Sequence, residues 1–238
     1  TTEFYRSILH TLLRVAAGFA AGMAAGLLAG TLTAFSRAAD VLLTPLKNII
    51  KATPVTSFIV LILLYFSSNV TPSAVAFLAV LPICWSNVCE GLRQTDKKMT
   101  ELAHAYAFGR KKTLREIYFP AVRPYLSAAA TTGLGFAWKS CVAAEVIALS
   151  KNSVGRALYE SKLYLETAEL FAWTASVVLI SVLFEKLLVH KLFKNRNTEG
   201  AAGRRSESLE HGHASCEAEL QYKSDAYAEY GRDEERNI

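Results

Sequence analysis

The chain has 238 residues, is 52% hydrophobic and carries a formal net charge of +5 at neutral pH. Its basic residues flank long apolar runs instead of forming one stripe, which favours a membrane protein over a nucleic-acid-binding one. It has no Gly-x4-Gly-Lys-Ser/Thr phosphate-binding loop, so we do not expect it to hydrolyse ATP itself.

The first apolar run covers residues 8–34 and, as a helix, is longer than the roughly 30 Å hydrocarbon core of a bilayer. Its glycines recur at every fourth position and therefore form one line along which another helix can approach closely. They are Gly18, Gly22, Gly26 and Gly30. The sequence leaves two partners open for this line: a second copy of the chain or a neighbouring helix of the same chain.

Residues 35–53 mix cationic with spaced apolar side chains and predict an amphipathic helix at the membrane interface. The second apolar run, 54–68, is short for a full crossing, and its Pro54 suits the first turn of a helix. The third run, 73–89, contains Pro82, where we expect a kink.

A basic interval at 91–124 separates these runs from the fourth, 126–149; polar loop residues follow, and a fifth run covers 170–189. The interval holds eight Lys and Arg against three Asp and Glu, and further lysines close the fifth run. The positive-inside rule places both regions in the cytoplasm, and five spans then put Thr1 outside.

The acidic tail, 195–238, is almost free of large apolar residues, so we expect it to be disordered; a partner-binding tail is the alternative. It contains His211, His213 and Cys216 at loosely metal-like spacing, but we expect no metal site there. The other cysteines lie in apolar runs and should act as small hydrophobic residues. They are Cys84, Cys89 and Cys141.

Within the basic interval, residues 101–117 carry two apolar patches at helical spacing, separated by "FGRKK". This pattern predicts two short amphipathic helices outside the membrane, with Gly109 closing the first in a left-handed conformation. Pro120 and Pro124 would then return the chain to the bilayer. The patterning favours a docking surface for another protein over an ordinary connection.

This segment resembles the EAA loop of ABC importer permeases, in which Glu-Ala-Ala, three residues, Gly, nine residues, Ile, one residue and Leu-Pro follow one another. The matching positions are Glu101, Ala103, Ile117 and Pro120; the departures are Leu102, Ala107 in place of the usual Gly, and Phe119. Gly109, two residues later, is expected to take over the bend. Similarity to the nitrate, sulfonate and taurine branch extends over nearly all of 1–192, and its members usually carry one more helix before this point.

The resemblance implies an all-α integral membrane protein with the type I ABC importer permease fold, about five transmembrane helices in residues 1–194 and a cytoplasmic coupling loop. It further implies a bacterial inner-membrane homodimer embedded in lipid, two ATPase subunits, an extracytoplasmic binding protein, no cofactor and no enzymatic site. The ATPase-coupling positions would be Glu101, Ala103, Ala107, Gly109, Ile117 and Pro120.

Lys139 and Glu145 lie inside the fourth run, where ionisable groups are costly and usually face a bundle interior or an aqueous path. They lie roughly 240° apart around a helix and should not pair with each other. Lys139 either contacts an anionic substrate or, equally, snorkels or pairs with another helix. Glu145 matches an acidic position of the family, which places it at an external gate or subunit interface.

Polar residues around the second and third spans either line a pathway or bond back to helix carbonyls, and the resemblance favours the pathway. They are Thr53, Pro54, Thr56, Ser57 and Asn87. The substrate that we expect is a small anion such as a sulfonate, taurine or nitrate. A neutral or cationic solute such as a vitamin precursor is the alternative, and a non-transporting membrane scaffold is a third possibility.

Overall fold

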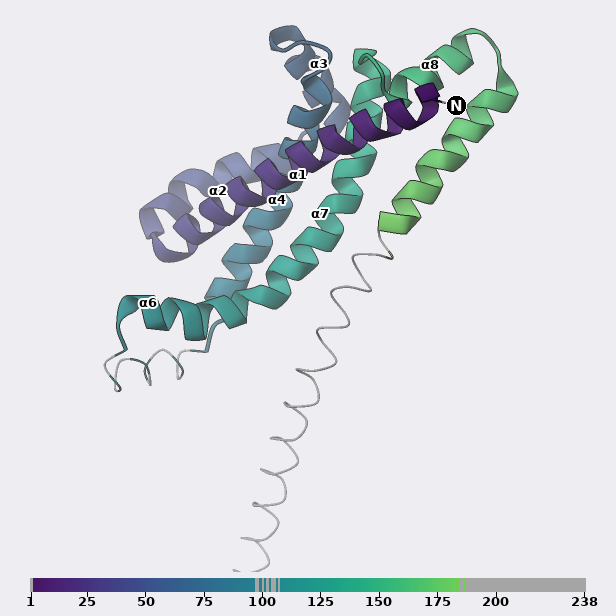
Figure 1. Cartoon of the computed structure of the whole chain (residues 1–238). Coiled ribbons are helices and arrows are strands. Elements are labelled where there is room, and N and C mark those ends of the chain that lie inside the picture. The colour runs from purple at the N-terminus through teal and green to yellow at the C-terminus, as the bar shows by residue number, and fades with distance from the viewer. Residues whose placement is uncertain are drawn as a thin grey trace, which may run out of the picture. The chain divides into compact units, whose positions relative to one another are not determined.

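The computed structural model describes residues 2–96, 99, 101, 103, 106, 108–184 and 186, and all regular secondary structure in these residues is helical (Figure 1). The chain divides into two units, Thr1–Leu188 and Val189–Ile238, and the description below concerns the first. The tail that we expect to be disordered, together with His211, His213 and Cys216, lies outside the described residues.

The closest helix pair consists of α1 (Thr2–Phe35) and α4 (Thr71–Arg93), which pack along the glycine line. A Cβ atom added at Gly18 would lie 2.5 Å from the Ser73 carbonyl oxygen, and one added at Gly26 would lie 2.6 Å from Cβ of Cys84. Carbon atoms in contact sit about 3.5–4.0 Å apart, so only glycine admits α4 this closely. The structure therefore assigns the glycine line to a neighbouring helix of the same chain.

The core lies between α1, α4 and α7 (Phe119–Ala148). Trp138 of α7 is fully buried there and meets the edge of Phe184 at a ring-centroid distance of 5.6 Å. The three cysteines of the apolar runs are all buried and unbridged, as the sequence predicts.

Next to this core, α2 (Arg37–Ala52) and α3 (Val55–Tyr65) form a helical elbow, bent by 103°. α2 is capped by Ser36, whose hydroxyl accepts from the Ala39 N–H, and it has no buried residue. We expected Pro54 in the first turn of the helix, but it lies just before α3 and has ψ of 138°. This extended conformation allows the sharp change of direction between α2 and α3.

The return from the basic interval differs from the expected pair of short helices and separate span. α6 (Arg110–Thr113) continues through a π-helical turn, η1 (Leu114–Tyr118), directly into α7. In this turn the Phe119 N–H bonds five residues back, to the Leu114 carbonyl. The wider π-helical turn lies just before Pro120. Proline has no N–H to donate, and in a regular α-helix its ring would clash with the carbonyl four residues earlier, so a wider turn accommodates it. The chain therefore returns as one helix.

The residues after 149, which we expected to form a polar loop, also differ from the prediction. They contain α8 (Val154–Leu163), capped by the Ser153 hydroxyl, which accepts from the Arg156 N–H. Leu149 ends α7 in the left-handed conformation with φ of 51°. α8 is followed by the helix Thr167–Phe184, the last one in the described part of the chain and called the last helix below.

By length and apolar composition, three described helices could cross a membrane: α1, α4 and Thr167–Phe184. The count rises to four if the bent pair α2 and α3 is one span, and α7, which contains Arg123, Lys139 and Glu145, is not among them. The five-span count and the span boundaries remain predictions.

Candidate functional site

The end of the bundle that carries the EAA-like segment is called the loop end below; Phe35 of α1 meets Tyr118 there at 5.3 Å between ring centroids. Glu101 is helical and exposed, whereas Ala103 is helical and only 4% exposed. The Phe108 N–H bonds to the Ala103 carbonyl at 2.9 Å, five residues back, which closes this short helix. Ala107, where the family has Gly, lies outside the described residues.

Gly109 does not close the first helix as expected. No described glycine has a positive φ, and the Gly109 carbonyl accepts from Lys112 N–H at 2.9 Å and Thr113 N–H at 3.1 Å. It therefore opens the second helix, because the bond from Phe108 has already ended the first. A Cβ added at Gly109 would meet nothing within 4 Å, so packing does not require glycine there either.

The remaining coupling candidates lie where the segment joins α7. Ile117 is half-buried in the π-helical turn, and Pro120 is exposed in the first turn of α7. Four large apolar side chains of the same sequence segment are more than half exposed: Met99, Tyr106, Leu114 and Phe119. Exposed apolar surface can mark an interaction site when it forms a continuous patch.

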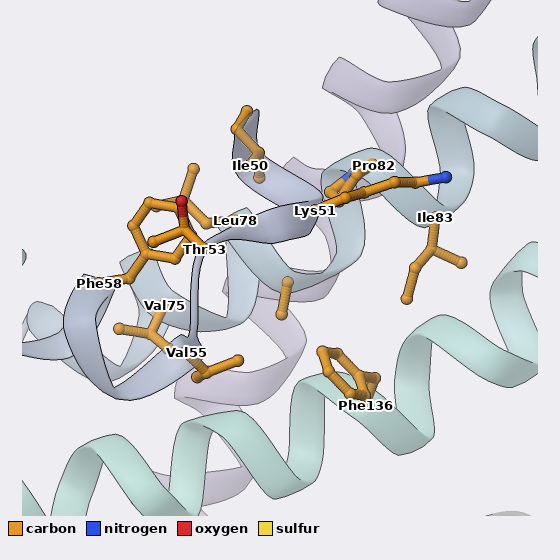
Figure 2. A pocket seen from close by; sticks show the side chains of 11 residues that line it. Ile50, Lys51, Thr53, Val55, Phe58, Val75, Leu78, Pro82, Ile83 and Phe136 are labelled. Carbon is orange, nitrogen blue, oxygen red and sulfur yellow. The ribbon is translucent and has the colours of Figure 1, made fainter. Parts of the chain in front are cut away.

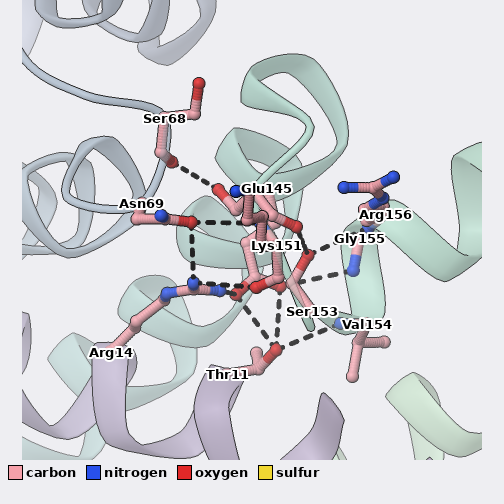
Figure 3. A network of polar contacts seen from close by, with 11 residues as sticks. Thr11, Arg14, Ser68, Asn69, Glu145, Lys151, Ser153, Val154, Gly155 and Arg156 are labelled. Atoms are coloured by element: carbon pink, nitrogen blue, oxygen red, sulfur yellow. Dashed lines mark hydrogen bonds and ion pairs between the residues drawn. The ribbon is translucent and has the colours of Figure 1, made fainter. Parts of the chain in front are cut away.

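At the opposite end, called the α8 end, a polar network surrounds Glu145, whose side chain is fully buried (Figure 3). Arg14 of α1 donates from Nη1 to Glu145 Oε1 at 3.0 Å, forming an ion pair. The Thr11 hydroxyl lies 2.9 and 3.0 Å from the two carboxylate oxygens. A buried carboxylate is tolerable only when it is paired and hydrogen-bonded in this way.

The network also includes the first turn of α8, whose Gly155 N–H donates to Glu145 Oε2 at 3.3 Å. The N-terminal end of a helix carries partial positive charge, which stabilises the carboxylate further. A Cβ at Gly155 would lie 2.5 Å from Glu145 Cβ, so glycine permits this approach. Arg14 Nη2 donates to the Lys151 carbonyl at 3.0 Å and to Asn69 Oδ1 at 3.3 Å.

Glu145 is one of the site residues predicted from the sequence, whereas its partner Arg14 is not. Arg14 is also an ionisable residue inside a predicted span, as Lys139 and Glu145 are, so the sequence carried the signal for it. Pairing Arg14 with Glu145, 131 residues away, requires the tertiary structure. The assignment of Glu145 to the pathway remains a prediction, although in this structure its carboxylate is wholly enclosed.

Lys139, by contrast, is exposed and lines a cavity of about 320 Å³ between α7 and the last helix, here called the lysine cavity. The hydroxyl-bearing residues of this cavity are Thr131, Thr132 and Ser181. Among the described residues, no carboxylate forms an ion pair with Lys139. As expected from their spacing, Lys139 and Glu145 do not pair.

Of the polar residues predicted to line a pathway, Thr53 lines a second cavity of about 210 Å³, here called the elbow cavity (Figure 2). Apolar side chains dominate its lining, with Phe58 of α3 on one side and Phe136 of α7 on another. Pro54, Thr56 and Ser57 are exposed at the start of α3.

Two of the predicted pathway residues donate side-chain hydrogen bonds to helix carbonyls. The Thr53 hydroxyl donates to Ile49 O at 2.8 Å, and Asn87 Nδ2 donates to Ile83 O at 2.8 Å. Asn87 is half-buried. No group of three or more metal-ligating residues occurs in the part of the chain that the structure describes.

Apolar helices that pack through a glycine line and are long enough to cross a membrane are typical of an integral membrane protein. Residues 22–191 match the family described as the binding-protein-dependent transport system inner membrane component. This chain belongs to that family. It is the permease subunit of an ABC importer and a multi-pass protein of the bacterial inner membrane, and ATP hydrolysis resides on a separate subunit.

Individual relatives differ in what their names say they carry. The chain is 27% identical over 201 residues to a putative aliphatic sulfonates transport permease of Bacillus subtilis, covering 82% of this chain and 72% of the relative. It is 31% identical over 193 residues to a riboflavin transport system permease of Chloroflexus aurantiacus, covering 78% and 72%.

Among solved structures, the inward-facing methionine ABC transporter MetNI is similar in fold, with a TM-score of 0.68 at 16% identity. The similarity covers 82% of this chain and 96% of the MetNI chain. The fold is therefore that of the type I ABC importer permeases, as the EAA-like spacing predicts.

Proposed function

We propose that this permease forms the translocation pathway for a small anion such as a sulfonate, taurine or nitrate, with Lys139 as its contact. The observation that supports this proposal is the lysine cavity, where an exposed ammonium group stands among three hydroxyl-bearing residues. An ammonium group and hydroxyls can all donate hydrogen bonds to the oxygens of an anion. Lys139 lies nine residues, or roughly 13 Å along the axis, from Ala148 at the end of α7, well inside the helix.

Among the described residues Lys139 has no ion-pair partner, which favours a role in binding substrate over a purely structural role. The buried charge of Glu145 has a structural role: it forms an ion pair with Arg14 and accepts hydrogen bonds from Thr11 and the Gly155 N–H. Lys139 has no such partner in the described part of the chain. The similarity to a sulfonates permease points to the same substrate class.

The test compares Lys139→Gln with Lys139→Arg in complexes reconstituted with the ATPase and binding protein, using labelled taurine, methanesulfonate and nitrate as probes. A charge-assisted hydrogen bond contributes about 1.5–3 kcal/mol, so Lys139→Gln should slow anion uptake by roughly 10- to 100-fold. Lys139→Arg should retain most of the uptake. The matched control is Lys51→Gln, which removes the exposed cation that lines the elbow cavity. Unchanged uptake by Lys139→Gln would refute the proposal.

A second candidate is a neutral, flat solute such as a vitamin precursor, which the elbow cavity favours. Phe58 and Phe136 offer aromatic surface there, and one relative is named a riboflavin permease. Under this candidate, Lys139→Gln leaves uptake unchanged, while Ala79→Leu, which fills the elbow cavity, abolishes it. The match to transport permeases also favours transport over the non-transporting scaffold.

We further propose that the loop end docks the ATPase subunit through Glu101, Ala103, Ala107, Gly109, Ile117 and Pro120. The exposed apolar side chains of Met99, Tyr106, Leu114 and Phe119 support this interface. A homodimer is proposed as well, because α2 and the helix Thr167–Phe184 leave large apolar surfaces that no other described residue covers. Lipid would cover the remainder.

A further inference from the structure

The last turn of α4 is where the bundle passes into the docking loop, and it is attached on two sides. On the α7 side, Gly91 lies against Tyr125: an added Cβ would be 2.7 Å from the ring carbon Cδ2. The Tyr125 hydroxyl also donates to Oε1 of Gln94. On the α2 side, Arg93, the last residue of α4, forms an ion pair with Asp40, Nη2 to Oδ2 at 2.6 Å.

The α2 helix has few other attachments to α4. Several of its apolar residues are exposed: Val41 is 74% exposed, Leu42 75% and Ile49 62%. A weaker contact, Lys47 Nζ at 5.7 Å from the Trp85 ring centroid, lies further along the helix. Asp40 is itself held in place by the Thr44 hydroxyl, which donates to Oδ1 at 2.9 Å. The Asp40–Arg93 pair is therefore a direct charged attachment of α2 to the last turn of α4.

The other end of α2 reaches the elbow cavity. From Asp40 to Ala52 the helix extends roughly 18 Å, and the cavity is lined by Ile50, Thr53 and Val55 at the bend (Figure 2). α2 is one continuous helix over this distance, although Pro45 near its middle has no N–H and removes one internal hydrogen bond. Because the helix is continuous, we expect a displacement at Asp40 to change the position of the bend.

We propose that the Asp40–Arg93 ion pair transmits movement of the docking loop to α2 and so to the elbow cavity. The inference rests on the ATPase docking proposed above but not on the identity of the solute. When the ATPase moves the loop, Arg93 moves with the end of α4, and Asp40 makes α2 follow. Without the pair, the loop moves while the elbow stays, so ATP hydrolysis continues without rearranging the cavity. Asp40 and Arg93 are thus positioning residues.

The pair contributes little to folding, which makes the proposal testable. Its side chains are 48% and 33% exposed, and partly exposed ion pairs add little stability. We therefore expect Asp40→Asn to fold and to melt within about 2 °C of the parent protein. The experiment must therefore measure a property other than stability, one that would not change if the ion pair were only structural.

The experiment follows maleimide labelling of Val55→Cys in the complete complex with its ATPase, with and without ATP plus vanadate. A Cys216→Ser background removes the tail cysteine, and the other three cysteines are buried. We expect the nucleotides to change the labelling rate, since allosteric coupling typically amounts to about 5- to 150-fold. Asp40→Asn should abolish this change while ATP hydrolysis continues, and the swap Asp40→Arg with Arg93→Asp should restore it.

The matched control is Glu90→Gln, which removes one negative charge one turn before Arg93 and retains an acceptor for the Gln94 amide. It should keep the nucleotide-dependent change. If Asp40→Asn also keeps it, or if the charge swap fails to restore it, the proposed link is wrong. If the parent complex shows no change although its ATPase hydrolyses ATP, the docking proposal itself fails. The two failures are therefore distinguishable.

Discussion

The glycine line between α1 and α4 can be tested at its tightest carbon–carbon contact, with Gly26→Ala. The new Cβ would lie 2.6 Å from Cβ of Cys84 and 2.9 Å from the Leu81 carbonyl oxygen. Ordinary contact is about 3.5–4.0 Å, so the helices must separate by roughly 1 Å. Neither obstacle can rotate away, because one is a backbone atom and the other is a Cβ atom fixed to the backbone.

The magnitude follows from two opposed effects. Overpacking a close-packed interface costs about 1–3 kcal/mol, with the upper half expected where backbone obstructs the new atom. Alanine recovers about 1 kcal/mol of helix propensity relative to glycine. The net loss is about 1–2 kcal/mol, which lowers the melting temperature by roughly 2–8 °C for a chain of this size.

The assay is thermal unfolding of the purified permease in detergent, followed by tryptophan fluorescence. Gly135→Ala is the matched control, since its added Cβ meets nothing within 4 Å and should leave the melting temperature unchanged or raise it slightly. Native mass spectrometry should show the same oligomeric state for both variants. The reasoning is refuted if Gly26→Ala is as stable as Gly135→Ala, or if it separates subunits without changing the melting temperature.

Two further predictions concern the ends of the bundle. Arg14→Met leaves the buried carboxylate of Glu145 without its cation and should cost about 3–5 kcal/mol, seen as a lower melting temperature, and adding Glu145→Gln should recover part of it. A double variant no more stable than Arg14→Met would argue against the ion pair as the cause. Glu101→Lys should reduce co-purification of the ATPase subunit at least about tenfold if docking loses about 1.4 kcal/mol or more. The control Glu169→Lys, near the start of the helix Thr167–Phe184, should not reduce co-purification of the ATPase subunit. Equal losses of co-purification in the two variants would contradict the docking role of Glu101.

Local sequence patterns predicted those features of the fold that depend on a residue's own neighbours. The four-residue spacing of Gly18 to Gly30 places the glycines along one line whatever packs against it, because the spacing is close to the helical repeat. The burial of Cys84, Cys89 and Cys141 likewise follows from their apolar surroundings. The spacing from Glu101 to Pro120 identified the permease family without any long-range contact.

Errors arose where a tertiary or medium-range bond overrode local propensity. Gly109 is a good candidate for a left-handed cap, but the bond from Phe108 to Ala103 ends the helix before it. Pro120 suggested a break between helices, and a π-helical turn accommodated it instead. α8 was missed because it is short and polar, and its stability derives from Glu145 and Thr11 at its first turn.

By itself, the sequence determined the apolar helices and the position of the EAA-like segment, because these depend on composition and spacing within short windows. The resemblance of that segment to the EAA loop indicated the class of protein. Only the tertiary structure decided that α4 covers the glycine line, that Arg14 neutralises Glu145, and that Asp40 holds Arg93. A periodic pattern shows which residues share a face of a helix. Which faces meet depends on how distant segments pack, and no local pattern carries that information.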